Sequence, residues 1–401
     1  MTTAPFDFQA LLAPLGIERF FADHWEKKPL HLRRDDAGYY QRLMTIQDLE
    51  RLISRGDARY PALRLAKGGG FFPPEAYTRN LKYGDDSFTG VPDVERIFSE
   101  YLAGATVTLP ALHRTWEPLE LLCSGIENRL DHSVHTNAYL TPAGTTGFTA
   151  HYDTHEVFVL QIAGSKHWRV YPPPLDLPHR SQSFPAATYT PPPQPLLDLT
   201  LSAGDLLYLP RGYVHAAQTA TSFSAHITVG ITVYTGVELA SELLQSCMQS
   251  PRWRRALPPG FASRPELRQT LKENMAALLR DLASADTDAV LDAFTRRVRA
   301  AQPRRPAPFR ADVTAIGPRT ALAVTARQPH GVAAQGDGTV LEFAGRQVLL
   351  PAAARPALDA MRMATTFMPE TLPGPLDLAA KLALVRHLHG MGFLEPAAVP
   401  G

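Results

Sequence analysis

The amino-acid sequence predicts an α+β protein in which a sandwich or barrel of short strands is flanked by helical segments. Two observations lead to this prediction: apolar residues recur with a period of two between about residues 104 and 234, and with helical spacing before and after that stretch. Short strands separated by Gly, Pro and Ser favour a sandwich or barrel over a parallel sheet with helical crossovers. The 401 residues, 45% of them hydrophobic, suffice for two or three domains with ample core.

The N-terminal segment is expected to be helical, with apolar residues at helical spacing from Phe8 to about Ile53. Thr45, followed three residues later by Asp48, is a candidate N-cap. Residues 67–74 are rich in Gly and Pro and predict an irregular surface loop. The strands expected after this loop are residues 105–109, 135–140, 157–162, 167–171, 205–209 and 224–229.

Helical spacing returns after Tyr234, at residues 237–244, 267–282 and 290–298. Residues 251–310 contain thirteen basic and six acidic residues, so this region is locally basic. It is either a solvated helix face followed by a linker around residues 302–306, or a ligand surface.

The C-terminal part predicts a small α+β module, plausibly of the winged-helix type. Residues 320–325 and 339–343 are expected strands, with Gly-Asp-Gly at 336–338 as the turn between them, and helices are expected at 353–361 and 376–388. We therefore expect three regions. They are a catalytic domain over 1–236 with its core at about 104–236, a helical region over 237–305, and the module over 306–401.

The composition excludes several functional classes. With 40 Lys and Arg against 39 Asp and Glu the formal charge is +1, so no global field attracts nucleic acid or an anionic membrane. The two cysteines, Cys123 and Cys247, cannot build a disulfide framework or a four-cysteine zinc site, which indicates a reducing compartment. The N-terminus lacks the features of a signal peptide, and no run of about 18 apolar residues occurs. We expect a cytoplasmic protein with no membrane partner.

Two short motifs carry the candidate chemistry. In the segment Gly-Phe-Thr-Ala-His-Tyr-Asp at 147–153, His151 and Asp153 are two residues apart on an expected strand, so they point to the same side. In the segment 204–215, Pro210 and Gly212 predict a sharp turn that directs His215 inward, with the spacing of the second sequence motif of the cupins. Together they predict two histidines and one carboxylate at one point.

Such a ligand set leaves coordination positions open for substrate and dioxygen and suits a non-haem Fe(II) oxygenase. Zinc-dependent hydrolysis uses a similar set, but the helical HExxH signature is absent and the ligands lie on expected strands. Either histidine alone would be interpreted as an ordinary hydrogen-bonded side chain. The joint pattern of turn chemistry, strand alternation and spacing argues against that interpretation.

Further polar residues lie beside these motifs. Lys166 follows a turn expected at residues 163–165 and is placed to pair with a carboxylate, although a lone Lys after a turn is more often solvated. Asn137 and Tyr139 are two residues apart on a strand, and either one could bind a co-substrate or simply pack. A ligating His usually donates its second N–H to another group. The candidates to orient the ligands, among which the sequence does not choose, are His155, Glu156, His167 and His226.

These motifs resemble the JmjC-type cupin oxygenases, specifically the ribosomal-oxygenase branch that hydroxylates ribosomal proteins. The matching segments are residues 20–30, 137–142, 147–153, 158–171 and 204–215. The resemblance implies a double-stranded β-helix (cupin/JmjC jelly-roll) core with an N-terminal helical extension, a helical dimerisation region and a C-terminal winged-helix domain. It also implies Fe(II) as the metal and 2-oxoglutarate as the co-substrate.

In that family His151, Asp153 and His215 would bind Fe(II), and Lys166 would pair with the distal carboxylate of 2-oxoglutarate. Asn137 and Tyr139 would line the co-substrate pocket, and no catalytic side chain beyond the metal ligands is implied. Two departures from the family pattern occur. Some bacterial members have Arg at the position of Lys166, and Thr219 replaces an Asn that is frequent at the last cupin-motif position.

Three functions follow from these observations. The first is an Fe(II)- and 2-oxoglutarate-dependent hydroxylase of a protein side chain, with a ribosomal protein as substrate and a homodimer as the assembly. The second is a tailoring hydroxylase of a small peptide or amino acid. The third is a non-catalytic dimeric cupin that serves as a binding module. The complete ligand set argues against this function, because a scaffold does not need metal ligands. Direct binding of nucleic acid stays open.

Overall fold

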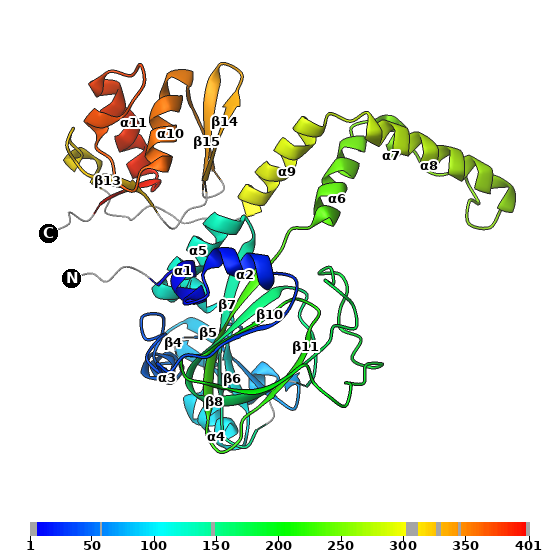
Figure 1. The fold of residues 1–401 in the computed structure, drawn as a ribbon, viewed down its shortest axis with the longest axis vertical. Coiled ribbons are helices and arrows are strands. Elements are labelled where there is room, and N and C mark those ends of the chain that lie inside the picture. Colours follow the sequence, from blue (N-terminus) through cyan, green and yellow to red (C-terminus); the bar gives the residue numbers. More distant parts are fainter. Residues whose placement is uncertain are drawn as a thin grey trace. The chain divides into compact units, whose positions relative to one another are not determined.

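The computed structural model of the chain is shown in Figure 1 and describes residues 6–56, 58–145, 149–301, 312–325, 330–343 and 346–397. Gly147 and Phe148 of the first motif, the expected linker at 302–306 and the expected boundary at 305/306 lie outside these ranges. The chain divides into two compact units, Met1–Val233 and Tyr234–Gly401. Within the described residues, no helix is both long and apolar enough to cross a membrane.

The first unit is built on a ten-stranded antiparallel sheet system among the described residues. Its main path runs in the order β1-β10-β8-β12-β7-β6-β2-β3, and β9 and β11 also pair with β8. The strands are β1 (Leu30–Leu32), β2 (Arg64–Lys67), β3 (Gly70–Phe71), β6 (Thr106–Leu109), β7 (Ser133–Thr141), β8 (Glu156–Tyr171), β9 (Leu197–Ser202), β10 (Leu206–Leu209), β11 (Val214–Gln218) and β12 (Ser224–Thr232).

Strand β8 joins the two halves of this system. Its first half pairs with β10 and β12, and its second half, from Ser165 onward, pairs with β9 and β11. The turn expected at residues 163–165 is therefore wrong, because the strand bends there without reversing. Gly164 has φ +63°, and a Cβ at this position would lie 1.9 Å from the carbonyl oxygen of Phe223. A glycine is what allows one strand to pass from one sheet to the other.

Helices cover the sheet of the first unit. They are α1 (Phe8–Leu12), α2 (Ile17–Asp23), α3 (Ile46–Ser54), α4 (Val94–Leu102) and α5 (Glu117–Leu130). Thr45 caps α3 as its sequence predicts, because its hydroxyl accepts the N–H of Asp48 over 3.2 Å and the Asp48 carboxylate accepts the N–H of Thr45. Helix α5 was not expected, because it lies within the stretch of about residues 104–234 that the sequence predicts as short strands.

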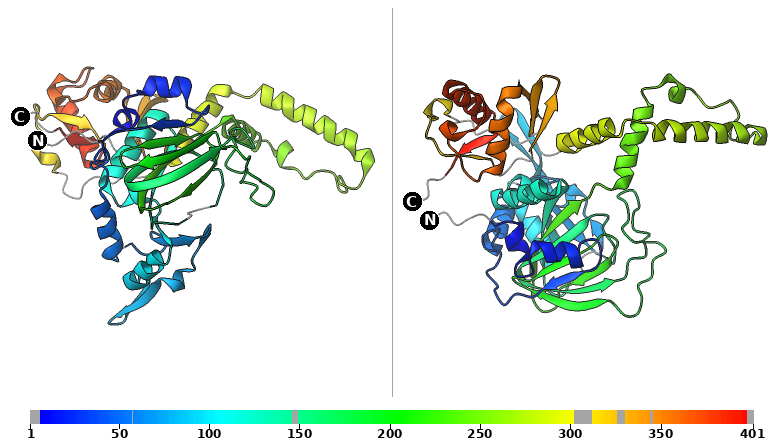
Figure 2. Two further views of the ribbon diagram at one scale, coloured as in Figure 1. Left: turned by 60° about the horizontal axis from the view of Figure 1, so that its bottom comes forward. Right: turned by 45° about the horizontal axis from the view of Figure 1, so that its top comes forward.

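Two hairpins lie outside the expected strand set. Residues 67–74, expected to be irregular, form part of the β2–β3 hairpin. The second hairpin consists of β4 (Thr78–Tyr83) and β5 (Asp86–Pro92), and Figure 2 shows it in light blue, projecting from the sheet. Both are short and polar, so period-two alternation of apolar residues does not mark them.

The N-terminal extension packs into the same core as the strands. Figure 1 shows α1 and α2 beside the sheet, and the ring of Phe20 lies 4.8 Å from that of Tyr208 and 5.4 Å from that of Phe158. All three aromatic side chains are fully buried. The extension therefore contributes to the hydrophobic core on which the site strands β8 and β10 rest.

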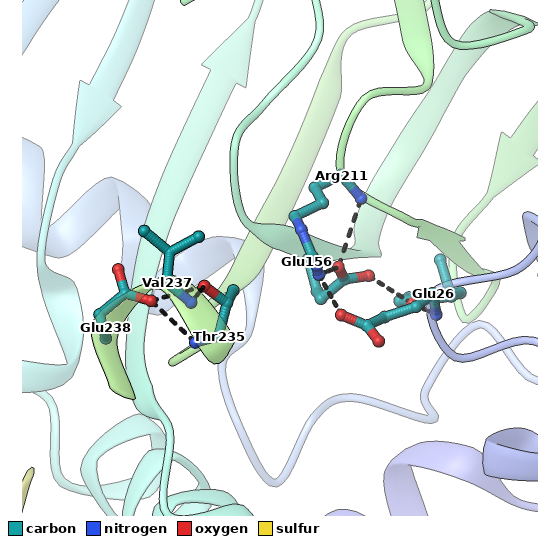
Figure 3. A network of polar contacts seen from close by, with 7 residues as sticks. Glu26, Glu156, Arg211, Thr235, Val237 and Glu238 are labelled. Carbon is teal, nitrogen blue, oxygen red and sulfur yellow. Dashed lines mark hydrogen bonds and ion pairs between the residues drawn. The ribbon is translucent and has the colours of Figure 1, made fainter. Parts of the chain in front are cut away.

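The second unit begins with helices α6 (Gly236–Cys247), α7 (Pro251–Arg254), α8 (Arg268–Ala283) and α9 (Thr287–Ala301). A capping box starts α6, because the Thr235 hydroxyl accepts the N–H of Val237 and the Glu238 carboxylate accepts the N–H of Thr235 over 2.8 Å (Figure 3).

The α+β part that follows has its own core. Its elements are β13 (Leu322–Val324), β14 (His330–Gln335), β15 (Gly338–Phe343), β16 (Arg346–Pro351), α10 (Arg355–Met363), α11 (Leu378–Gly390) and β17 (Leu394–Pro396). The expected hairpin between residues 320–325 and 339–343 is wrong. Strand β13 pairs with β17, and the glycine turn instead connects β14 to β15. Strand β14 contains Gly and three Ala or Gln, so its strand signal is weak.

Candidate metal centre

The structure brings the three predicted ligands together. His151, Asp153 and His215 each offer one ligand atom, and these atoms all lie within 4.8 Å of one another. The backbones of the two histidines form an isolated antiparallel bridge, with His215 N–H donating to His151 O over 2.8 Å and the reverse bond at 3.2 Å. His215 lies on β11. The strand expected to carry His151 and Asp153 is wrong, because this segment lies before β8 and has only the isolated bridge at His151.

Carbonyl oxygens fix the orientation of both imidazoles. His151 Nδ1 lies 2.7 Å from the carbonyl of Thr149, and His215 Nδ1 lies 3.1 Å from the carbonyl of Tyr213. A carbonyl can only accept, so Nδ1 carries the proton and Nε2 of each neutral ring carries the lone pair. Nε2 of His215 lies 3.7 Å from Oδ2 of Asp153. This is the arrangement of a metal ligand whose tautomer is set by its backbone neighbour.

The electrostatics favour the protonation states that bind a divalent cation. Burial, and after it the neighbouring His151, lower the pKa of His215 to about 4. Burial alone would raise the pKa of Asp153, but the attraction of His155, His215 and His151 outweighs it and lowers that pKa below its usual range. Near neutral pH the site therefore presents a neutral His215 imidazole and the Asp153 carboxylate, and metal ligands are bound in these states.

A buried polar network connects the two ligand segments (Figure 3). Glu156 accepts a hydrogen bond from Arg211 Nη1 over 2.7 Å and another from the Tyr208 hydroxyl over 2.5 Å. Arg211 also pairs with Glu26, whose N–H donates to the Tyr208 hydroxyl over 3.0 Å. Glu156 is fully buried and Arg211 is 6% exposed. The sequence did not identify Arg211 as part of this network. The only sequence signal for it was its position as a charged residue between Pro210 and Gly212 of the turn.

A cavity of about 240 Å³ adjoins the three ligands. Lys166, Asn137 and Tyr139 all line it, as the sequence predicts for one pocket. Lys166 is 5% exposed, and its Nζ donates to the Thr141 hydroxyl over 3.3 Å. No carboxylate of the described residues forms an ion pair with it. Burial lowers the pKa of Lys166 to about 8. The cavity thus contains a desolvated cation that lacks a counter-ion.

Two residues of this cavity were not assigned to it from the sequence. Trp168 Nε1 and His226 Nδ1 are buried and have no hydrogen-bond partner in the part of the chain that the structure describes. The Trp168 ring lies 5.9 Å from the rings of both His215 and His226, and His226 stacks on Tyr139 at 4.8 Å. Trp168 follows Lys166 by two residues on β8, and residues two apart on a strand face the same side. This spacing could have identified Trp168 as a residue of the same cavity.

The other candidates divide clearly. His155 Nε2 lies 3.9 Å from Asp153 Oδ1, so it is placed beside the ligand set. His167 points away and pairs with Asp198 over 2.5 Å. The Thr219 hydroxyl donates to the carbonyl of Pro142 over 2.6 Å and accepts from the backbone at Thr145, so it holds a loop together.

Comparison with known proteins places this centre in a family. The JmjC domain family matches residues 114–239, the part of the chain that carries all three clustered residues. Residues 114–239 match a JmjC domain, and ribosomal oxygenases are among the proteins that are similar to this chain. Ribosomal oxygenase 2 of Mus musculus is 31% identical over 242 residues, which cover 60% of this chain and 50% of that protein.

Another relative is the bifunctional lysine-specific demethylase and histidyl-hydroxylase NO66 of Drosophila persimilis. It is 30% identical over 222 residues, which cover 55% of this chain and 30% of that protein. The chain therefore spans half or less of the length of these relatives.

The fold of the chain is similar to that of a solved structure, YcfD, a ribosomal oxygenase from Escherichia coli in complex with cobalt and 2-oxoglutarate. The TM-score is 0.54 at 18% identity, over 94% of this chain and 97% of that one. This likeness confirms the predicted fold class, a mixed architecture with the large antiparallel sheet of the JmjC cupins.

Proposed function

We propose that the protein is an Fe(II)- and 2-oxoglutarate-dependent oxygenase that hydroxylates a protein side chain, with a ribosomal protein as substrate. The observation that carries the proposal is the juxtaposition of a two-histidine, one-carboxylate cluster with the buried cation Lys166, in one cavity. YcfD binds cobalt and 2-oxoglutarate, and NO66 is named a histidyl-hydroxylase. These relatives support the same cofactors and the same class of substrate here.

The donor set fits ferrous iron. Two imidazoles and one carboxylate on one side of an ion leave the opposite positions open, which is the arrangement of non-haem Fe(II) oxygenases. His151, Asp153 and His215 would hold the metal. Iron and 2-oxoglutarate, when bound, supply the oxidation of a C–H bond to an alcohol. The contribution of the protein is to place charges and exclude water.

The cavity fits a dicarboxylate. Lys166 would pair with the distal carboxylate, which would return to this cation the electrostatic stabilisation that burial has removed. The Asn137 side-chain oxygen accepts the N–H of Ala111 over 3.1 Å, so the amide group is oriented with its NH₂ available as a donor. Trp168 Nε1 is a second donor in the same cavity. Together these groups would fix the co-substrate between Lys166 and the metal.

We also propose roles for the remaining regions. Residues 237–305 would mediate homodimerisation, supported by large apolar side chains that the chain leaves exposed. They include Val237, Leu244, Met248, Met275, Leu279 and Leu291, with exposures of 47% to 65%. Residues 306–401 would form a winged-helix-like domain, supported by two helices and a three-stranded sheet around one core. A cytoplasmic location is supported by the scarcity of cysteine.

The experiment is an assay of the purified protein with Fe(II), ascorbate, 2-oxoglutarate and ribosomal proteins, read by succinate release and by mass spectrometry for one added oxygen atom. We expect both signals with the wild type and neither with His215→Ala. Turnover of a free peptide or amino acid in place of ribosomal proteins would indicate a tailoring hydroxylase. Silence with intact metal binding would indicate a binding module.

A further inference from the structure

A second concave surface lies on the first unit, outside the metal cavity. It has a volume of about 530 Å³ and is formed by the end of α3, the chain leading into β2, and the segment after β6. Its apolar side chains are Leu52, Leu109 and Leu112, and its charged side chains are Arg55, Arg64 and Arg114. None of the described residues that line it is an Asp or a Glu. We call this surface the arginine groove.

The three arginines have no counter-ion among the described residues. None of them forms an ion pair with a described carboxylate, and Nε of Arg64 is buried without a hydrogen-bond partner among the same residues. By contrast, Arg211 in the same unit is neutralised by Glu26 and Glu156. Three like charges around an apolar floor create a local positive potential, even though the net charge of the whole chain is close to zero. The groove is therefore complementary to an anion.

Exposed aromatic rings lie beside Arg64 and the nearby Arg59. The guanidinium carbon of Arg64 lies 5.8 Å from the ring centre of Tyr60 and 5.6 Å from that of Phe71, and the guanidinium of nearby Arg59 lies 4.9 Å from the ring of Phe88. These three rings are 36% to 55% exposed. Flat guanidinium and aromatic groups that remain accessible are surfaces on which nucleobases stack.

The arginine groove adjoins the metal cavity through two backbone connections. The tip of the β2–β3 hairpin, two residues before Phe71, lies against Thr149: a Cβ at Gly69 would lie 3.1 Å from the Thr149 side chain. The carbonyl of Thr149 holds Nδ1 of His151. On the other side, Ala111 lines the groove and donates its N–H to Asn137, which lines the metal cavity. The groove and the metal cavity are therefore in contact through the hydrogen bond between Ala111 and Asn137.

We propose that the arginine groove binds single-stranded RNA, with phosphates paired to Arg55, Arg64 and Arg114 and bases stacked on Phe71 and Tyr60. An acidic peptide would satisfy the charges, but it would leave the exposed rings and the apolar floor without a matching group. A basic protein segment would be repelled by the same charges. The proposal does not depend on the proposed oxygenase activity, because binding is measured without turnover.

The test uses the full-length protein and a short fluorescent oligouridine, followed by fluorescence anisotropy at several salt concentrations. The triple variant Arg55→Gln, Arg64→Gln, Arg114→Gln is expected to bind at least about tenfold more weakly, and the slope of log affinity against log salt should become shallower by about 2. Arg64 is partly buried, so the double variant Arg55→Gln, Arg114→Gln guards against misfolding. This double variant should show about two thirds of the slope change of the triple variant.

Two further variants complete the design. Phe71→Leu keeps an apolar side chain but removes the stacking surface, so binding should weaken about fivefold with an unchanged salt slope. The matched control Arg254→Gln, Arg255→Gln, Arg264→Gln removes three exposed arginines of the second unit, and RNA affinity should stay at the wild-type value. Undetectable wild-type binding, groove variants that bind like the wild type, or an equal loss in the control would overturn the proposal. Stronger competition by polyglutamate than by unlabelled RNA would assign the groove to acidic peptides and overturn it as well.

Discussion

Arg211 donates a hydrogen bond from Nη1 to Oε1 of Glu156 over 2.7 Å, and this buried ion pair links the two chain segments that carry the candidate metal ligands. Glu156 follows Asp153 by three residues, and Arg211 precedes His215 by four. The N–H of Gly212, beside Arg211, donates to the carbonyl of Asp153 over 3.0 Å. The geometry of the metal site thus depends on a charge pair that does not itself face the metal.

Glu156→Gln should therefore destabilise the fold and weaken metal binding together. Removing one partner of a buried ion pair leaves the other charge uncompensated, which costs about 3 kcal/mol of unfolding free energy. Urea denaturation of the metal-free protein and titration with Co(II) would measure the two effects. Glu26→Gln is the matched control, because the Glu26 side chain is 34% exposed and its loss should be milder. If Glu156→Gln stays within about 0.5 kcal/mol of the wild type, the network is not structural.

Lys166→Met should make the protein more stable and a weaker binder of 2-oxoglutarate. The substitution replaces an unpaired buried cation by an apolar side chain of similar length, so a desolvation penalty disappears. Co-substrate affinity should fall by about 2 kcal/mol or more, because the distal carboxylate loses its partner. Thermal denaturation and calorimetric titration of the Co(II)-loaded protein test the two halves. A destabilised variant with normal affinity would place the anchor elsewhere.

The affinity for 2-oxoglutarate should decrease as the pH rises above about 8, where Lys166 loses its proton. Below this pH the cation is present and affinity is constant; above it, the dissociation constant should rise by about tenfold per pH unit until the pKa of the complex is reached. His226 faces Lys166 but is neutral throughout this range, since burial and then Lys166 place its pKa well below the ordinary value. Lys166→Arg keeps its charge and should bind with no such decline; a decline that persists in this variant contradicts the assignment.

Trp168→Phe isolates one hydrogen-bond donor. The variant keeps a large aromatic ring but removes Nε1–H, which is buried and unpartnered in the protein. We expect 2-oxoglutarate binding to weaken by about 1 kcal/mol. The free energy of unfolding should not decrease, because the substitution removes no hydrogen bond within the described protein. Trp116→Phe serves as the comparison, because Nε1 of Trp116 donates to the carbonyl of Leu43 over 2.7 Å and its loss should cost stability but not affinity. Unchanged affinity in Trp168→Phe would show that this N–H does not contact the co-substrate.

Dimerisation through residues 237–305 predicts that charges on its exposed apolar face will produce monomers. Met275 and Leu279 are both 65% exposed and one turn apart on α8. The double variant Met275→Glu, Leu279→Glu should halve the mass measured by light scattering. Leu349→Glu, at an equally exposed position on β16, should leave the mass unchanged. A dimer that persists in the double variant would move the interface to another surface.

Features that depend on short chain segments were predictable from the sequence. The spacing of His151 and Asp153 directs both side chains to one side, the turn before His215 is encoded by Pro and Gly, and Thr45 caps a helix through a residue three positions away. Each depends on dihedral preferences and neighbours within a few residues, which the sequence displays directly. The β-rich core and the JmjC family resemblance follow from the same local patterns.

Only the tertiary structure decided how distant segments meet. Arg211 and Glu26 are separated by 185 residues, and neither has a local pattern that names its partner. At Gly164 the strand continues past the close approach of Phe223, next to β12. A glycine in a loop would look the same in the sequence, so the sequence could not distinguish a bend from a turn. Lysine is usually a surface residue and tryptophan a core residue. Burial in the metal cavity leaves Lys166 without an ion pair, and Trp168 Nε1 without a hydrogen-bond partner, among the described residues. Pairing and desolvation are properties of the packed fold, so periodicity and spacing cannot supply them.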